Sequence, residues 1–160
     1  APDAVEIIEA EHGKPALGGI WASSGLRFNL SHSGGLAVYA FALRRELGVD
    51  VEELRPIPDA LDLAKRFFSA TESAAVQAFP LDRRDLAFLS CWTRKEAFVK
   101  AIGQGLSFPL DAFSVSVDPD APARILDVKG VPGPQTGWTL SAFRPCTTHV
   151  CARSGCLSPR

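Results

Sequence analysis

Alternation of apolar and polar residues predicts β-strands along much of the chain. The segment LRFNLS (26–31) alternates strictly, which is typical of a half-buried strand that turns its apolar residues inward. The segment LAVYAFAL (36–43) is apolar almost throughout, and VDVEEL (49–54) alternates again. By the same pattern we expect further strands at residues 4–11, 112–117, 123–128, 138–143 and 148–152.

The period changes in the middle of the chain, where apolar residues recur three or four positions apart, as on one face of a helix. We expect a helix over 59–68 and a second over 71–79, which Ser69 or Thr71 can cap. A long helix is expected over 82–102, with its first residue, an aspartate, as the cap and the glycine-rich GQG segment as its end.

Together these elements predict an α+β fold, in which a mostly antiparallel sheet packs against helices that include the long helix 82–102. A chain of 160 residues, 46% of them hydrophobic, can bury such a core. The net charge of −1 excludes a domain that binds nucleic acid through bulk positive charge. No apolar run approaches the ~20 residues of a membrane span, so we expect no membrane partner.

Cysteine usage and the first residues indicate a cytoplasmic protein. The spacing of Cys91, Cys146, Cys151 and Cys156 does not match a zinc site, and reduced thiols are the favoured interpretation. The first residues are acidic and contain no apolar core of a signal peptide. The chain contains no methionine, which indicates a processed chain or a fragment.

Asp50 and Glu52 lie two positions apart on the strand expected at 49–54, so both carboxylates leave the same face. Adjacent like charges cost energy unless a cation neutralises them, and Mg²⁺ prefers one or two carboxylates together with substrate phosphates. The spacing by itself favours a solvated edge strand over a metal site.

The long helix places Trp92, Glu96 and Lys100 four residues apart on one stripe, with Lys95 beside it. A carboxylate and two ammonium groups next to an aromatic ring could clamp a phosphate-rich ligand. By itself the stripe favours the alternative, glutamate–lysine pairs on a solvated surface. We expect Trp92 to pack the helix rather than to contact a ligand.

Ser31 and His32 lie where the strand at 26–31 meets the glycine turn HSGG. A hydroxyl, an imidazole and free backbone N–H groups at such a turn suit a phosphate, although a lone histidine is more often structural. A serine–histidine nucleophile is disfavoured, because neighbouring residues on a strand point to opposite faces and no G-x-S-x-G elbow is present.

Four segments together resemble the 4′-phosphopantetheinyl transferases of the surfactin-synthetase type in order and spacing. They are HGKPAL (12–17), FNLSHS (28–33), GVDVE (48–52) and the stretch 67–106, which runs from FFSATE to WTRKEAFVKAIGQGL. The resemblance implies the fold of that family, here the C-terminal half and the end of the N-terminal half. Residues 1–45 would end the N-terminal pseudo-repeat, and 46–160 would form the C-terminal one with the metal site.

The resemblance also implies an enzyme, a holo-carrier-protein synthase. It would transfer the 4′-phosphopantetheine arm of coenzyme A to a serine of an acyl or peptidyl carrier protein and release adenosine 3′,5′-bisphosphate. Such carriers serve fatty-acid, polyketide or non-ribosomal peptide synthesis. Coenzyme A would be the co-substrate, and Mg²⁺, or alternatively Mn²⁺, the cofactor.

On the positions that match the family's motifs, the resemblance implies metal ligands at Asp50, Glu52 and Glu96. It implies coenzyme A contacts at Lys14, Ser31, His32, Lys95 and Lys100. Glu96 is also the candidate base for the serine proton, and the sequence does not separate this role from that of a ligand. Lys100 would act in catalysis by offsetting phosphate charge. An acidic carrier could meet basic residues such as Arg44, Arg45 or Arg94.

Members of this family are longer, with two pseudo-symmetric halves and coenzyme A between them. The chain starts close to its GKP segment, so we expect most of the first half to be missing, to be a separate piece, or to be replaced by a second copy of this chain. An incomplete site leaves an alternative, a truncated module that binds coenzyme A or a carrier without transfer. A metal-dependent phosphohydrolase would need the same carboxylates and is less favoured.

Overall fold

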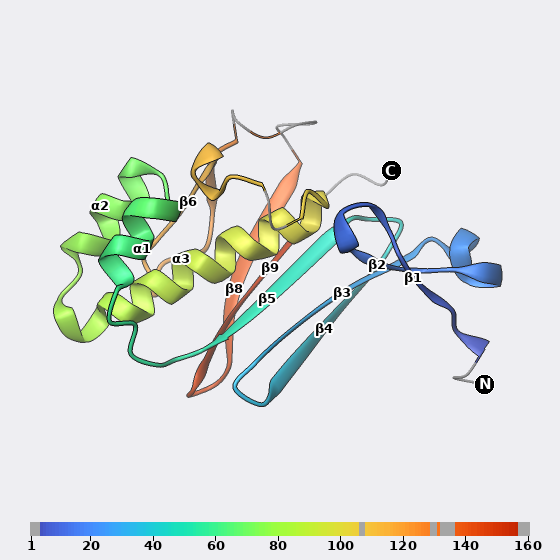
Figure 1. The fold of residues 1–160 in the computed structure, drawn as a ribbon, viewed down its shortest axis with the longest axis horizontal. Helices are drawn as coiled ribbons and strands as arrows, with labels where there is room; N and C mark the ends of the chain where they lie inside the picture. The colour runs from blue at the N-terminus through green and yellow to red at the C-terminus, as the bar shows by residue number, and fades with distance from the viewer. Residues whose placement is uncertain (1–3, 106–107, 129–130, 132–136, 157–160) are drawn as a thin grey trace.

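A long helix packed on an antiparallel sheet forms the centre of the molecule (Figure 1). The computed structural model describes residues 4–105, 108–128, 131 and 137–156. Helix α3 (Leu81–Ile102) lies across a three-stranded sheet in the order β5 (Leu47–Glu53), β9 (His149–Cys156) and β8 (Trp138–Cys146). The expected α+β class is thereby confirmed.

Within the described residues, the remaining strands form three two-stranded antiparallel sheets. The largest of them is the hairpin of β3 (Leu26–Ser33) and β4 (Leu36–Leu43), which packs beside β5. Its turn contains Gly34 and Gly35, both with positive φ, as a two-residue hairpin turn of this kind requires. The small sheets pair β1 (Ile7–Glu9) with β2 (Pro15–Leu17), and β6 (Ser114–Val115) with β7 (Ile125–Asp127).

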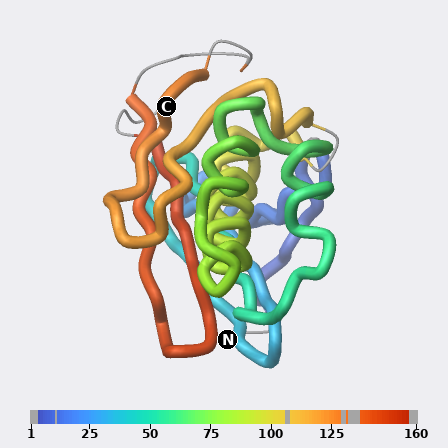
Figure 2. The backbone as a smooth tube through the Cα atoms, turned by 90° about the vertical axis from the view of Figure 1, so that its left-hand side faces the viewer, coloured from blue at the N-terminus to red at the C-terminus, as the bar shows by residue number. Residues whose placement is uncertain are grey.

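Two shorter helices complete the helical layer. Helices α1 (Ala60–Phe67) and α2 (Ala70–Ala78) both contact α3, and Figure 2 shows α3 between the β8–β9 strands and the chain of α1. Ser69 rather than Thr71 caps α2, in a capping box with Glu72. In the described part of the chain, no helix is long and apolar enough to cross a membrane.

The expected long helix is confirmed, but its cap was wrong. Pro80 occupies the N-cap position, the helix begins at Leu81, and Asp82 lies inside the first turn. The Asp82 carboxylate is attracted to the positive end of the helix dipole there, and it makes no capping hydrogen bond to a backbone N–H. Gly103 ends the helix in the left-handed conformation, as the GQG segment predicts.

Aromatic residues fill the core between the three helices and the sheet. Trp92 packs against Phe67, Phe68 and Phe88, with ring centroids 5.9–6.3 Å apart, which confirms its expected packing role. The ring of Phe98 packs against those of Phe113 and Trp138, with centroids 4.9 and 5.5 Å apart. The core of the described residues is therefore centred on α3, the element that also holds Glu96 and Lys100.

Several strand boundaries differ from the expectation. The strand expected over 4–11 is limited to β1, because the residues after it enter a short 3₁₀ helix, Glu11–Gly13, and return as β2. The strand expected over 112–117 reduces to β6. Conversely, β8 and β9 are longer than predicted and form one hairpin, since each pairs along most of its length.

The polar face of β3 is buried, where the alternation predicted solvent, while Phe28 on the apolar face is buried as expected. Asn29 and Ser31 are buried, whereas Leu30 is partly exposed. Their side chains accept hydrogen bonds from the backbone N–H groups of β5, from Val49 to Asn29 (2.8 Å) and from Val51 to Ser31 (3.4 Å). A side-chain ladder thus joins two strands that do not pair as a sheet, and it places β3 against the acidic strand.

Candidate functional site

Asp50 is the centre of the candidate site. Its side chain lies on β5, is 4% exposed, and receives hydrogen bonds on Oδ1 from Ser31 (2.8 Å) and from the ammonium of Lys100 (2.7 Å). Lys100 also lies 3.2 Å from the Ser31 hydroxyl and 3.3 Å from the Val49 carbonyl oxygen. The structure therefore brings Ser31, Asp50 and Lys100 together from β3, β5 and α3.

Gly48 allows this approach, because β5 runs directly against the last turns of α3. A Cβ at position 48 would overlap the carbonyl oxygen of Ala97 and the backbone nitrogen of Ala101. It would also lie 2.8 Å from the Cβ of Lys100. Glycine is thus required for the close packing that sets Asp50 beside Lys100.

Glu52 and Glu96 lie close enough to Asp50 for the three charges to act on one another. Ser33 donates a hydrogen bond to Oε2 of Glu52 (3.1 Å), two residues along β3 from the contact of Ser31 with Asp50. Burial and the charge of Asp50 raise the pKa of Glu52, against the hydrogen bond from Ser33. Burial and the same charge also raise the pKa of Glu96, against the attraction of Lys100.

In Asp50, as in Glu52 and Glu96, burial outweighs the contacts that favour the charged carboxylate. Burial raises the pKa of its carboxyl group, although Lys100 and Ser31 favour the charged form. Its second oxygen, Oδ2, is buried and has no hydrogen-bond partner. An unpaired carboxylate oxygen in such a place lacks the compensation that buried charges normally have.

These oxygens fit a hard divalent cation by type and charge. Among the described residues, however, no three histidine, cysteine, aspartate or glutamate side chains are close enough to hold a metal ion as they stand. The fit therefore rests on the unpaired Oδ2 of Asp50 and on the repulsion among Asp50, Glu52 and Glu96. Part of the charge of Asp50 is already balanced by Lys100.

A cavity of about 400 Å³ opens beside this cluster. It is lined by Glu96 and Lys100 of α3, by Asn29 of β3, and by Lys14, which precedes β2. Lys14 forms an ion pair with Glu46 (2.9 Å) and lies 3.4 Å from the carbonyl oxygen of Ala101. The cavity has the volume of a small-molecule site and presents two lysines and a carboxylate to its contents.

His32 is not part of this cluster. It is exposed and neighbours the buried Ser31 on β3, so the two side chains leave opposite faces of the strand. The expected separation of Ser31 from His32 is therefore present, and it argues against a serine–histidine pair. Of the two, only Ser31 lies beside Asp50.

Lys95 is not brought to the cavity either. Its side chain is fully buried and donates to Glu72 and to the carbonyl oxygen of Phe113, both at 2.7 Å, with its ammonium 4.2 Å from the centre of the Phe113 ring. Such an enclosed ammonium group does not face a ligand in this structure. The resemblance implied a contact with coenzyme A; the structure instead places Lys95 in a core ion pair.

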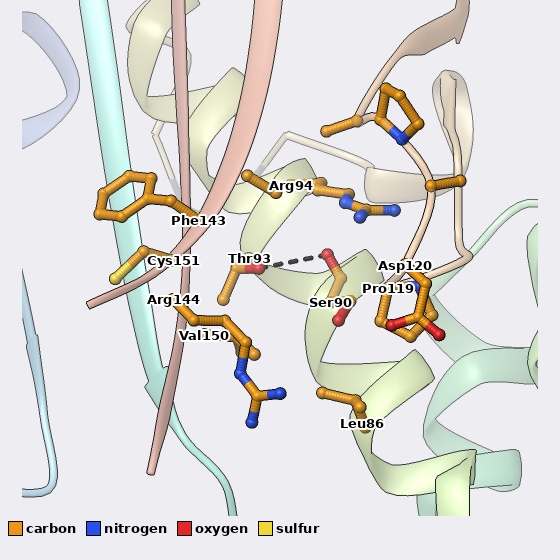
Figure 3. Close-up of a pocket in the computed structure, with 14 residues that line it drawn as sticks. Leu86, Ser90, Thr93, Arg94, Pro119, Asp120, Phe143, Arg144, Val150 and Cys151 are labelled. Atoms are coloured by element: carbon orange, nitrogen blue, oxygen red, sulfur yellow. Dashed lines mark hydrogen bonds between the residues drawn. The ribbon is translucent and has the colours of Figure 1, made fainter. Parts of the chain in front are cut away.

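A second cavity, of about 380 Å³, lies on the other flank of α3, beside β8 and β9 (Figure 3). Ser90, Thr93 and Arg94 line its helical wall, and the Thr93 hydroxyl bonds to the Ser90 carbonyl oxygen (3.1 Å). The guanidinium of Arg94 is buried and donates to the carbonyl oxygen of Ser116 (2.7 Å). Arg94 is thus withdrawn from the surface on which we expected it to meet a carrier.

Sequence reasoning missed Asn29, Ser33 and Glu72. The first two follow from the alternation in FNLSHS, which places residues 29, 31 and 33 on one face, but a polar face suggested solvent. Glu72 lies in the first turn of α2 and completes its capping box. Its Oε1 also accepts from the N–H of Val115 (2.7 Å), a contact that no sequence signal indicates.

Comparisons with known proteins find relatives of one superfamily. The family model of the 4′-phosphopantetheinyl transferase superfamily matches residues 46–152. The chain is 40% identical to the 4′-phosphopantetheinyl transferase HetI of Nostoc over 124 residues, which cover 78% of this chain and 52% of HetI. It is 40% identical to the 4′-phosphopantetheinyl transferase Sfp of Bacillus subtilis over 115 residues, 72% of this chain and 49% of Sfp.

Solved structures share the fold. The Chronobacterium ammoniagenes ACPS–CoA complex superposes with a TM-score of 0.53 at 18% identity, over 69% of this chain and 95% of that one. A holo-(acyl-carrier-protein) synthase of Bacillus anthracis in complex with CoA (3′,5′-ADP) gives the same TM-score and identity, over 69% and 94%. The chain spans about half the length of the curated relatives it matches.

Proposed function

Since the chain belongs to the 4′-phosphopantetheinyl transferase superfamily, we propose that it transfers the 4′-phosphopantetheine arm of coenzyme A to a serine of an acyl or peptidyl carrier protein. One observation supports this most directly. Lys14, Glu96 and Lys100 line one cavity, and Lys100 also bonds to Asp50 at 2.7 Å. Acidic oxygens and ammonium groups in one place suit a pyrophosphate that binds together with a cation.

Coenzyme A would lie in the cavity with its pyrophosphate near Lys100 and Lys14. Both ammonium groups are held by carboxylates, Lys100 by Asp50 and Lys14 by Glu46, so their positions are set before a ligand binds. Lys100 is 26% exposed and can turn toward an anion. Ser31 holds the other side of Oδ1 of Asp50 and keeps that carboxylate in place.

Asp50, Glu52 and Glu96 would hold Mg²⁺, or Mn²⁺ in its place. When bound, the ion neutralises phosphate charge and aligns the displacement. The unpaired Oδ2 of Asp50 is the ligand atom that the structure supports best. Because the charge of Asp50 raises the pKa of Glu52 and of Glu96, and that of Glu52 also raises the pKa of Glu96, a cation bound among them would relieve this repulsion.

In the reaction, the hydroxyl oxygen of the carrier serine bonds to the β-phosphorus of coenzyme A. The bond to the phosphate on the adenosine side breaks, and adenosine 3′,5′-bisphosphate leaves. Glu96 would receive the serine proton, since it lines the cavity and faces Lys100 across one helical turn. Lys100 would offset the charge on the leaving phosphate.

The division of the chain at residues 45 and 46 is part of this proposal, because Ser31 and Lys14 reach the cluster from before it and all three carboxylates from after it. His32 would contact coenzyme A only from the exposed face of β3. The carriers of fatty-acid, polyketide or non-ribosomal peptide synthesis are the proposed substrates. A cytoplasmic location is proposed too, and the free thiols of all four cysteines fit a reducing compartment.

Intact-mass measurement of an apo acyl carrier protein tests the proposal. The carrier is incubated with this chain, coenzyme A and Mg²⁺, and we expect a gain of one phosphopantetheine group that disappears with EDTA. The variant Asp50→Ala/Glu96→Gln should lose the transfer and stay folded. Asp62→Asn, which changes an exposed carboxylate on α1, is the matched control and should keep it.

Two other outcomes would replace the proposal. Coenzyme A binding by a folded chain without any mass gain would show the truncated binding module instead, alone or awaiting another chain or a second copy. Cleavage of coenzyme A without a carrier would show a phosphohydrolase. Full transfer by the Asp50→Ala/Glu96→Gln variant would overturn the assignment of these carboxylates.

A further inference from the structure

A cysteine and a histidine face each other across the turn between β8 and β9, outside the candidate site. Cys146 ends β8 and is exposed, His149 begins β9 and is buried, and the two are directly paired in the hairpin. Sγ of Cys146 lies 3.3 Å from Nδ1 of His149. The strand register shifts between Phe143 and Cys146, an irregularity that re-aims the side chains beside it.

A third group fixes the orientation of His149. Nε2 lies 3.0 Å from the carbonyl oxygen of Ser33. Because a carbonyl oxygen only accepts, Nε2 carries a proton and donates it. Nδ1 therefore faces the thiol, as an acceptor in the neutral ring or as a donor to a thiolate in the charged ring. The thiol of Cys146, the imidazole of His149 and the carbonyl oxygen of Ser33 thus lie in the order nucleophile, base and orienting acceptor, which is the arrangement found at activated thiols.

The turn that holds this pair is anchored on both sides. The backbone N–H of Leu54 donates to the carbonyl oxygen of Thr148 (2.8 Å). The guanidinium of Arg144 donates to the carbonyl oxygen of Thr147 (3.2 Å). The Thr148 hydroxyl lies 2.9 Å from Nδ1 of His149 and 3.3 Å from Sγ. In Figure 1 this turn lies at the same end of the molecule as the β3–β4 turn, which carries Ser33.

The electrostatics agree with this geometry. Hydrogen bonds from the hydroxyl and backbone N–H of Thr148, with a further contribution from His149, lower the pKa of Cys146 to about 7. Burial lowers the pKa of His149, but the hydrogen bonds to Cys146 and Ser33 and the charges of Cys146 and Glu53 outweigh it, so the pKa is raised. Glu53 of β5 and Arg144 of β8 are the charged residues beside the turn.

We propose that Cys146 is a covalent modification site that reacts with low-molecular-weight disulfides. Its thiolate bonds to one sulfur of the disulfide, the bond between the two disulfide sulfurs breaks, and the second sulfur leaves as a thiolate that takes a proton from His149. The product is a mixed disulfide on Cys146 and one free thiol. The disulfide is itself the oxidant, so the step needs no other.

The other cysteines offer a comparison within the same chain. Cys91 and Cys151 are buried, and burial raises the pKa of Cys151 to about 12. Cys156 is partly exposed at the far end of β9. At pH 7 a thiol of pKa 7 is ~50-fold more ionised than one of pKa 9, while its weaker basicity costs about eightfold in nucleophilicity. Cys146 should therefore react about sixfold faster than an ordinary thiol.

Oxidised glutathione is the probe for this proposal. After incubation with the folded chain at pH 7, intact mass and peptide mapping should show one glutathionyl group on Cys146 that dithiothreitol removes. Cys146→Ser should abolish the adduct and Cys156→Ser should leave it unchanged. The apparent midpoint of the rate against pH should lie near 7.

Variants of the two neighbours separate an activated thiol from a merely exposed one. His149→Gln removes the imidazole, and Thr148→Val removes the hydroxyl from an exposed turn and serves as the second test in case His149→Gln does not fold. Each should slow the reaction several-fold and move its midpoint to higher pH. Equal rates at Cys146 and Cys156, or unchanged rates and midpoints in both variants, would overturn the proposal.

Discussion

Helix α3 contains two lysines that each bond to an acidic residue, and the two pairs differ in their burial and in their remaining contacts. Lys95 and Glu72 are both buried completely, and the ammonium group of Lys95 is held by two acceptors and an aromatic ring. Lys100 and Asp50 are also 2.7 Å apart, yet Lys100 is 26% exposed and one oxygen of Asp50 has no partner. We call Lys95–Glu72 the closed pair, because both residues are enclosed in the core. We call Lys100–Asp50 the open pair, because Lys100 lines a cavity and one oxygen of Asp50 is unpaired.

This difference separates a structural pair from the pair proposed to be functional more clearly than residue type does. A closed pair of opposite charges holds its surroundings together, and breaking it leaves an uncompensated charge in the core. An open pair with an unused oxygen can accept another charged group without first being taken apart. The step of five residues from Lys95 to Lys100 turns the second lysine toward β5 and away from α2, so one helix supports both pairs.

The largest predicted effect concerns the closed pair. Lys95→Met should lower the free energy of unfolding by about 3–5 kcal/mol, because Glu72 would keep a buried charge without its partner. Urea denaturation at neutral pH measures the change. Lys65→Met is the matched control, since Lys65 and Asp62 are exposed and 3.9 Å apart, and it should change stability by less than ~0.5 kcal/mol. Equal effects of the two substitutions would contradict the comparison.

The second predicted effect concerns the contact that brings the open pair together. Gly48→Ala should cost about 2–3 kcal/mol, because the added Cβ overlaps backbone atoms of Ala97 and Ala101 that cannot move aside as a side chain would. Gly103→Ala is a useful second variant, since open space surrounds position 103 and only its left-handed backbone opposes a side chain. Thermal unfolding should therefore rank Gly48→Ala as the more damaging change.

The sequence predicted the fold class, the long helix and the acidic strand, because each depends on local periodicity or on a motif. It also indicated Asp50, Glu96 and Lys100, whose spacing is set by one strand and one helix. Lys95 shows the limit of such reasoning. It adjoins Glu96 in the same motif, but whether it faces the cavity or the core depends on α2, which packs against that side of α3.

The orientation of β3 shows a second limit. Alternation located the strand and the burial of Phe28, but it predicted an exposed polar face, because polar residues normally face solvent. Here Asn29, Ser31 and Ser33 accept hydrogen bonds from N–H groups of β5 at 2.8–3.4 Å. Burial of these side chains follows from the unpaired backbone of another strand, which no pattern within residues 26–33 reveals.

A smaller effect is expected in the pH dependence of stability. Burial raises the pKa of Asp50, Glu52 and Glu96 above their unfolded values near 4, so the folded chain binds more protons than the unfolded chain. Their contribution to stability is complete below about pH 4 and is lost as pH rises through the folded values.

The variant Asp50→Asn/Glu96→Gln tests that direction. The variant lacks the two charges, so the wild type should lose stability relative to it as pH rises above about 4. The free energy of unfolding of the variant minus that of the wild type should therefore increase with pH. Urea titrations of both proteins at several pH values measure the difference. A gap that narrows with rising pH would mean that these carboxylates are well compensated in the fold, and the contrast with the closed pair would fail.

The smallest effect on stability is expected where the closed and open pairs are compared most directly. Lys100→Met removes the same charge from the same helix as Lys95→Met, but solvent reaches Lys100, and Asp50 can take up a proton instead. We expect a smaller loss than for Lys95→Met, because only one partner of this pair is buried, although Asp50 would lose its counter-charge. Binding of coenzyme A, measured by calorimetry, should nevertheless weaken at least about tenfold, because a charge-assisted contact to phosphate would be lost. A large loss of stability with unchanged binding would make Lys100 a second structural lysine and would remove the distinction between the two pairs.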